Sequence, residues 1–333
     1  MGGNALNFQT RRVESAAEFR TLVIEVLRIL TSELGWHVAP VRWYHTKESF
    51  GDMDILVDSD TIDPNWVDVV LEKFRPKDHF KNGPYLSFDY KDVQVDLILA
   101  PDKEFEFSYY YFAWNDLGNF VGRTAHRLGF KFGRDGLWYV LRDPKDYSRV
   151  IKEILVTQDF DLAVNFLGYR SQPFKIGFDA PEDIYQFVTT SPYFDPRQFL
   201  LVNRSYAARV RDKKRKMYTG MLEFIRQNYP EIPEDCDPLP IDRSEHLTRA
   251  FNDFPEFKER YNSTMSEFHL ECKFKERFNG KFVGKLFGIQ GKELGECMAQ
   301  MRQTIVEATV TLGDDKFTVV LCLPLQQVVC YLH

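Results

Sequence analysis

Apolar residues recur at helical spacing near the N-terminus. Ser15 and Glu18 form the pattern of a capping box ahead of them, and Gly35 stands where a helix would end. The pattern predicts a helix over about residues 16–34 with one face in the core. The residues on that face are Phe19, Leu22, Val23, Val26, Leu27, Leu30 and Leu34.

Short apolar segments separated by polar turns follow this helix. They predict strands at 38–44, 54–57, 85–90 and 93–99, with a second helix after Asp63-Pro64. The order helix, strand, strand, helix, strand, strand favours a small mixed sheet that helices back on one side.

The sequence beyond Pro101 becomes first aromatic and then basic, and we expect mainly helices there. Alternation over 306–323 around Gly313-Asp314-Asp315 predicts a small C-terminal β-hairpin. The predicted fold class is α+β, with a mixed sheet backed by helices, then mainly helical domains, then the hairpin. We divide the chain into domains at 1–100, 101–200 and 201–333.

The composition narrows the class of protein. Of 333 residues, 44% are hydrophobic and 15% aromatic, so a large core is expected and disorder is excluded for most of the chain. No apolar run is long enough to span a bilayer, and the five cysteines include no CxxC pair. We therefore expect a cytoplasmic protein with no membrane partner. The net charge of -6 argues against a uniformly basic nucleic-acid binder.

Three aspartates form the most informative pattern in the sequence. Asp52 and Asp54 follow Gly51 at the start of a predicted strand, and residues two apart face the same side of a sheet. Asp96 lies within an otherwise apolar strand, where an unpaired buried carboxylate costs several kcal/mol. Such a trio suits two Mg²⁺ ions, which Mn²⁺ can replace, about 3.5–4 Å apart for an in-line phosphoryl displacement. The alternative is a solvated Asp-x-Asp pair with Asp96 in a salt bridge.

The segment from Glu48 to Leu56 resembles the metal-binding loop of the DNA polymerase beta-like nucleotidyltransferases, and is closest to that of the family X DNA polymerases. There a glycine and an Asp-x-Asp start a strand, and a third aspartate follows on a later strand. The resemblance covers about residues 15–200. Its downstream part is the run Tyr111, Phe112, Asn115, Asp116, Leu117, Asn119 and Arg123, which is similar to the segment that checks the incoming nucleotide.

This resemblance implies a nucleotidyltransferase palm and a reaction. A nucleoside monophosphate would pass from an NTP or dNTP to the 3′-hydroxyl of DNA or RNA, releasing pyrophosphate. Asp52 and Asp54 would bind both metal ions, and Asp96 would bind the catalytic one and help deprotonate the 3′-hydroxyl. A transferase directed to tRNA ends and a non-catalytic palm that only binds nucleic acid remain alternatives.

Further roles follow residue by residue from the same resemblance. Tyr111 and Phe112 would pack against the sugar of the nucleotide, Asn119 would contact the base edge, and Arg123 the opposing strand. For all four, the alternative is an ordinary place in the core or on a polar helix face.

The sequence departs from the family at two places. Val41-Arg42 stands where the family has Gly-Ser, so Arg42, Lys47 and the backbone of Gly51 would hold the phosphates instead. Ala113-Trp114-Asn115 stands where the family usually has Thr-Gly-Ser.

A basic run lies between Arg204 and Lys216, where seven cations stand against one carboxylate, Asp212. A cationic run beside a nucleic-acid-processing site is expected to follow phosphates, although many such runs are solvated faces. The residues assigned to nucleic-acid binding here are Arg211, Lys213, Lys214, Arg215 and Lys216.

Overall fold

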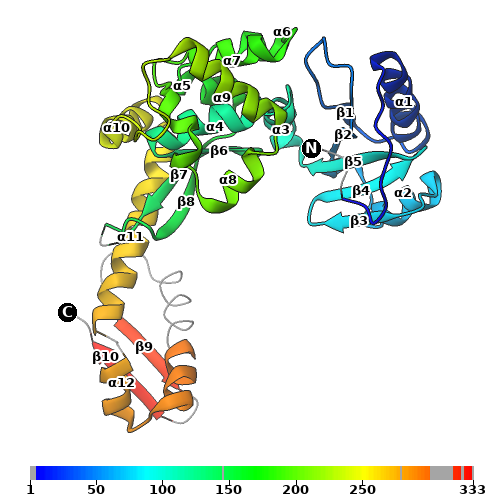
Figure 1. Ribbon diagram of the computed structural model, residues 1–333. Helices are drawn as coiled ribbons and strands as arrows, with labels where there is room; N and C mark the ends of the chain where they lie inside the picture. Colours follow the sequence, from blue (N-terminus) through cyan, green and yellow to red (C-terminus); the bar gives the residue numbers. More distant parts are fainter. Residues whose placement is uncertain (1–4, 145, 278–279, 301–317, 324–325, 332–333) are drawn as a thin grey trace. The chain divides into compact units, whose positions relative to one another are not determined.

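A five-stranded mixed sheet forms the N-terminal part of the protein in a computed structural model (Figure 1). The structure describes residues 5–144, 146–277, 280–300, 318–323 and 326–331. The strand order is β1-β2-β5-β4-β3; β2 pairs parallel with β5, and the other neighbours pair antiparallel. The strands are β1 (Val38–Pro40), β2 (Asp52–Asp58), β3 (His79–Asn82), β4 (Tyr85–Tyr90) and β5 (Val93–Ala100).

Two helices cover one face of this sheet. They are α1 (Ala16–Arg28), which continues as a π-helical turn (Ile29–Glu33), and α2 (Trp66–Phe74), with a short 3-10 turn (Ser59–Thr61) before it. Their apolar faces pack on Met53, Ile55 and Val57, the alternate residues of β2. The predicted mixed sheet is therefore confirmed, but its predicted backing on one side alone is not, because α3 (Asp102–Phe112) covers part of the opposite face. The strand expected at 38–44 is shorter, and the exposed edge strand β3, which has no alternating pattern, was not predicted.

The opposite face of the sheet is divided in two. Helix α3 (Asp102–Phe112) covers Leu56 and Ile98 through side chains that include Tyr109 and Phe112. The other part of this face, at the start of β2, is not packed in that cluster and carries the aspartates. The aspartates therefore lie beside the part of the sheet that α3 covers, and not under that helix.

Mainly helices were expected after Pro101, and no strand was predicted over residues 130–157. This segment forms a three-stranded antiparallel sheet in the order β6-β7-β8, with a tight turn at Arg134-Asp135. Its residues are rich in Phe, Trp, Tyr and Val, which favour strands, and the strands are too short to show a clear period. The strands are β6 (Phe130–Gly133), β7 (Gly136–Arg142) and β8 (Val150–Thr157).

Helices surround this second sheet, and α4 (Leu117–Leu128) packs directly on β6. Many of the largest buried side chains here are phenylalanines, including Phe107, Phe120, Phe160 and Phe174. The other elements to residue 261 are α5 (Phe160–Phe166), α6 (Gln172–Ile176), α7 (Pro181–Thr189), two 3-10 turns (Pro196–Phe199 and Leu201–Asn203), α8 (Tyr206–Asp212), α9 (Lys216–Asn228), α10 (Arg243–Asp253) and the start of α11 (Pro255–Arg277).

The chain divides into two compact units, Met1–Tyr261 and Asn262–His333. The second contains most of α11, then α12 (Gly280–Phe287) and the antiparallel strands β9 (Thr318–Leu323) and β10 (Gln326–Tyr331). The hairpin was expected over 306–323, but its turn at 313–315 lies outside the described residues, and the described pair lies later in the chain. In the part of the chain that the structure describes, no helix combines the length and apolar character needed to cross a bilayer.

Two glycines one turn apart on α4 are expected to differ sharply in their tolerance of a methyl group. A Cβ on Gly118 would lie 2.3 Å from the carbonyl oxygen of Tyr111, whereas one on Gly122 would lie 3.8 Å from that of Phe132. Gly118→Ala should therefore lower the free energy of unfolding by about 1–3 kcal/mol. Gly122→Ala should raise it by about 0.5–1 kcal/mol, because alanine favours the helix. Urea denaturation measures both, and equal effects would contradict the close approach of α3 to α4.

Candidate active site

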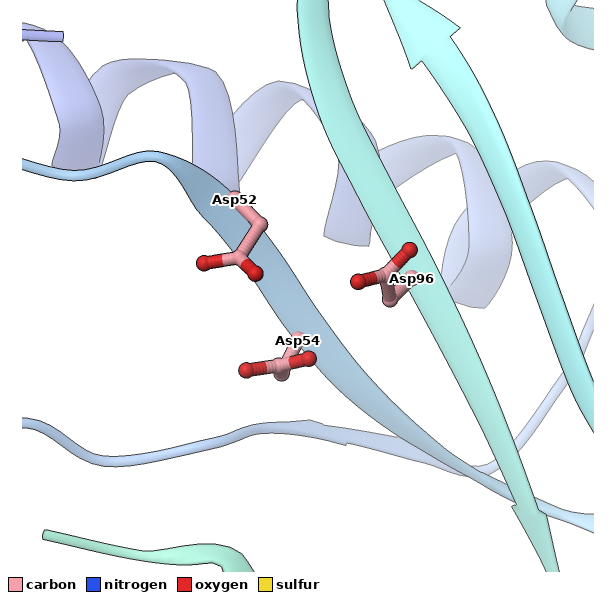
Figure 2. A group of neighbouring side chains, drawn as sticks. All are labelled: Asp52, Asp54 and Asp96. Carbon is pink, nitrogen blue, oxygen red and sulfur yellow. The ribbon is translucent and has the colours of Figure 1, made fainter. Parts of the chain in front are cut away.

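Parallel pairing of β2 and β5 brings the three aspartates together (Figure 2). Asp54 lies directly opposite Asp96 in the register, and Asp52 is two residues earlier on the same face of β2. One carboxylate oxygen from each lies within 4.8 Å of the others. The predicted convergence of these residues is confirmed, and the cluster has the geometry of a site for metal ions.

The cluster concentrates negative charge that nearby cations do not balance. Burial and the charges of Asp52 and Asp96 raise the pKa of Asp54 well above its ordinary value. Burial is also the main cause that raises the pKa of Asp96 to about 6. The positive charge of Lys47 lowers the pKa of Asp54, but less than burial raises it. Burial also lowers the pKa of Lys47 itself. An oxygen-rich, over-charged trio of this kind fits a hard divalent cation.

Asp96 is held by two neighbours that sequence reasoning missed. The Gln94 side-chain amide donates to both carboxylate oxygens of Asp96, at 2.9 Å each. Ser87 lies opposite Asp96 on β4, and its hydrogen bond, with that of Gln94, lowers the pKa that burial raises. Gln94 is two residues from Asp96, so the alternation of a strand could have identified it. Nothing local in the sequence indicates Ser87.

A cavity of about 360 Å³ opens beside Asp52 and Asp54. Its walls combine side chains from the sheet, from α3 and α4, and from the start of α9. Among the predicted residues that line it are Arg42, Lys47, Tyr111, Phe112 and Asn119, and Arg215 lines it as well. The cavity therefore gathers the residues assigned to nucleotide binding, apart from Gly51, which is buried at the bend before β2.

Asp116 connects the basic run to this cavity. Its carboxylate accepts from Arg215 Nη1 at 2.5 Å and from Asn119 Nδ2 at 3.0 Å. Arg215 was assigned to nucleic-acid binding within the run, but the structure places it in the wall of the aspartate cavity. Asp116 stands in the run similar to the nucleotide-checking segment but was assigned no role there, and its partner Arg215 lies 99 residues away in the sequence.

The loop before β2 is anchored to the segment 175–179. Arg42 Nη1 donates to the carbonyl of Lys175 at 2.6 Å, and Thr46 donates to the carbonyl of Asp179 at 2.8 Å. The ring of His45 lies 2.6 Å from the Asp179 carboxylate. The guanidinium of Arg42, predicted to hold phosphates, thus has a structural partner as well as a place in the cavity wall.

Trp114 and Asn115, at the second departure from the family pattern, both adopt a left-handed backbone with φ of 61°. This conformation is uncommon for residues other than glycine, and the surroundings must impose it. The buried indole N–H of Trp114 donates to the backbone carbonyl of Phe174 at 3.0 Å. The backbone N–H of Trp114 donates to the backbone carbonyl of Arg42. These contacts hold the turn that carries Asn115 and Asp116 to the cavity.

The remaining predicted residues lie elsewhere. Arg123 donates to the carbonyl of Gln198 at 2.7 Å and lines a second cavity. Arg211 donates to the buried carboxylate of Asp212 at 2.8 Å. Three lysines of the run have exposed side chains, namely Lys213, Lys214 and Lys216.

The raised pKa values of Asp54 and Asp96 predict how stability depends on pH without metal. A raised pKa means that the folded state binds the proton more tightly than the unfolded state does. The protonated carboxyl groups therefore contribute fully to stability below about pH 4, and this contribution is lost as pH rises through about 6. The shift of Asp96 alone corresponds to about 3 kcal/mol. The two aspartates alone should therefore make stability fall between pH 4.5 and 7.5. Burial lowers the pKa values of His126 and His246, which act in the opposite direction, so urea denaturation in EDTA measures the fall as the difference between wild type and Asp54→Asn.

Asp54→Asn should remove part of this fall and be more stable than wild type at pH 7.5, because one of the repelling charges is gone. Asp68→Asn, an exposed position on α2, is the matched control and should follow the wild type. An advantage of Asp54→Asn over wild type that does not grow from pH 4.5 to 7.5 would contradict the proposed cost of the ionised cluster.

Comparison with known proteins leaves the family open: no protein-family model matches the chain, and no curated protein matches it.

Proposed function

We propose that this protein is a metal-dependent nucleotidyltransferase that moves a nucleoside monophosphate from a nucleoside triphosphate to a nucleic-acid 3′-hydroxyl and releases pyrophosphate. The observation that carries the proposal is the trio of Asp52, Asp54 and Asp96 on adjacent parallel strands, with oxygens within 4.8 Å of one another. A carboxylate cluster without cations only destabilises the sheet, so a role in binding divalent ions accounts for it.

The trio would hold Mg²⁺ or Mn²⁺, which supplies charge neutralisation and Lewis-acid activation when bound. Lys47 and Arg215 line the same cavity and would neutralise the charge of the triphosphate. Asp96 would accept the proton of the attacking 3′-hydroxyl, the role that the resemblance implies for it. Gln94 orients this carboxylate by donating to both of its oxygens.

A non-catalytic palm that only binds nucleic acid is the second candidate. Arg42 favours it, because this residue stands in place of the family's phosphate-binding pair and its guanidinium donates to the carbonyl of Lys175. The two candidates differ in whether triphosphate is consumed.

The deciding experiment incubates the protein with Mg²⁺ or Mn²⁺, labelled NTPs or dNTPs, and primed DNA, single-stranded DNA or tRNA. We expect label to pass to at least one acceptor, with pyrophosphate released in equal amount. Asp54→Asn should lower the rate by at least about a thousandfold while the circular dichroism spectrum is unchanged. Asp68→Asn should keep wild-type activity. Full activity in Asp54→Asn would exclude the mechanism, and transfer to tRNA alone would indicate the tRNA-end-directed class.

Tyr111 is expected to influence the choice of sugar. Its ring lies 5.2 Å from that of Phe112, both residues line the cavity, and Phe112 is also packed against the sheet. Tyr111→Ala should ease entry of a 2′-hydroxyl, shifting the ratio of kcat/KM for NTP over dNTP by about 1–3 kcal/mol. Steady-state kinetics with matched ATP and dATP measure this ratio. An unchanged ratio with measurable transfer would return Tyr111 to a packing role.

A further inference from the structure

A second cavity of about 340 Å³ lies on the other side of Tyr111 and Asn119, which line both cavities. Its remaining walls come from α4, from β6, β7 and β8, and from Arg204. We call it the α4 groove. The two shared residues make the groove a neighbour of the aspartate cavity, so a chain lying in the groove would approach the site along Tyr111 and Asn119.

The α4 groove is lined by more cations than anions. Arg123, Lys131, Arg142 and Arg204 line it, and Glu153 is the one carboxylate among its described lining residues. Glu153 pairs with Lys131 at 2.5 Å, and Arg204 pairs with the buried carboxylate of Asp212 at 2.9 Å, so the remaining positive charge of the lining comes from Arg123 and Arg142. Burial and the charges of Arg243 and Arg142 lower the pKa of His126, as expected for a surface of positive potential.

Contacts with the protein hold these cations in place. Arg123 donates to the carbonyl of Gln198, and Arg142 donates to those of Tyr147 and Ser148 at 3.2 and 3.4 Å. Backbone carbonyls carry no net charge, so they fix a guanidinium without cancelling it. A guanidinium fixed in this way is suited to the oxygens of a phosphate.

The floor of the groove also leaves room for a ligand. Gly122 lines it, and a Cβ built there meets nothing closer than the Phe132 carbonyl at 3.8 Å. Tyr111 supplies an aromatic ring at the end shared with the aspartate cavity. Cations spread along a groove, with a ring at one end, suit a single-stranded polynucleotide better than one compact anion.

We infer that the α4 groove binds the single-stranded 3′ end of the acceptor and leads it past Tyr111 and Asn119 to the aspartates. This inference rests on the proposed transferase function for its direction. The binding itself needs no catalysis, so it can be tested separately.

The test measures binding of 5′-labelled single-stranded oligo(U) and oligo(dT) to the full chain by fluorescence anisotropy, in EDTA and without nucleotide. Lys131→Ser/Arg142→Ser should weaken binding by at least about tenfold, and should flatten the slope of log K against log salt by about 1.4. The control Arg28→Ser/Lys91→Ser removes the same charge, and Lys91 likewise pairs with a glutamate, Glu25, at 2.6 Å. It should bind as the wild type does.

A steric variant separates shape from charge. Gly122→Leu should fill the groove and weaken oligonucleotide binding, while Gly122→Ala keeps the fold and most of the binding. Unchanged binding in both the double cation variant and Gly122→Leu would overturn the inference. It would also be overturned if inorganic phosphate or a mononucleotide bound as tightly as the oligonucleotide and lost the same affinity in these variants, since the groove would then hold a small anion.

Transfer assays distinguish the two proposals. If both stand, Gly122→Leu raises the KM for the acceptor and leaves the KM for the triphosphate unchanged. If the wild type binds oligonucleotide through the groove but transfers nothing, the transferase proposal fails and the groove remains as a nucleic-acid site.

Discussion

Parallel pairing of β2 with β5 is the constraint on which the site depends. The register places Asp54 beside Asp96 on the same face, and Asp52 follows from the alternation of β2. Burial, and to a lesser extent repulsion between neighbouring carboxylates, raises the pKa values of Asp54 and Asp96. Gln94 and Lys47 offset only part of this increase. The sheet therefore carries a local loss of stability, as sites selected for binding commonly do.

Strand alternation made the aspartates predictable. Residues two apart share a face wherever the strand lies, so Asp52 and Asp54 could be paired from the sequence, and Asp96 was conspicuous among apolar neighbours. Contacts between segments that are distant in the sequence leave no comparable pattern within either segment. Ser87 opposite Asp96, and Arg215 on Asp116 at 99 residues' separation, depend on register and packing and could not be predicted. The sheet at 130–157 was not predicted because its strands are too short to show a clear period.

Asp212 shows why a count of charges overestimated the positive charge that the basic run (204–216) presents to a ligand. Its carboxylate is 1% exposed and accepts from both Arg204 and Arg211, at 2.9 and 2.8 Å. Buried charges need partners, so these arginines contribute to the packing of α8. Arg215 likewise forms an ion pair with Asp116. Lys213, Lys214, Lys216 and Arg211 keep the exposure that the charge pattern suggested, and Arg211 nevertheless pairs with Asp212.

The anchoring of the 41–49 loop affects the order in which the site can form during synthesis. Arg42 hydrogen-bonds to Lys175, 133 residues later in the chain. At translation rates of about 5–20 residues per second, residue 175 leaves the ribosome roughly 7–27 s after residue 42. The strands that carry the aspartates are complete by residue 100. The nascent chain can thus bring its three carboxylates together well before the loop beside them acquires its anchor.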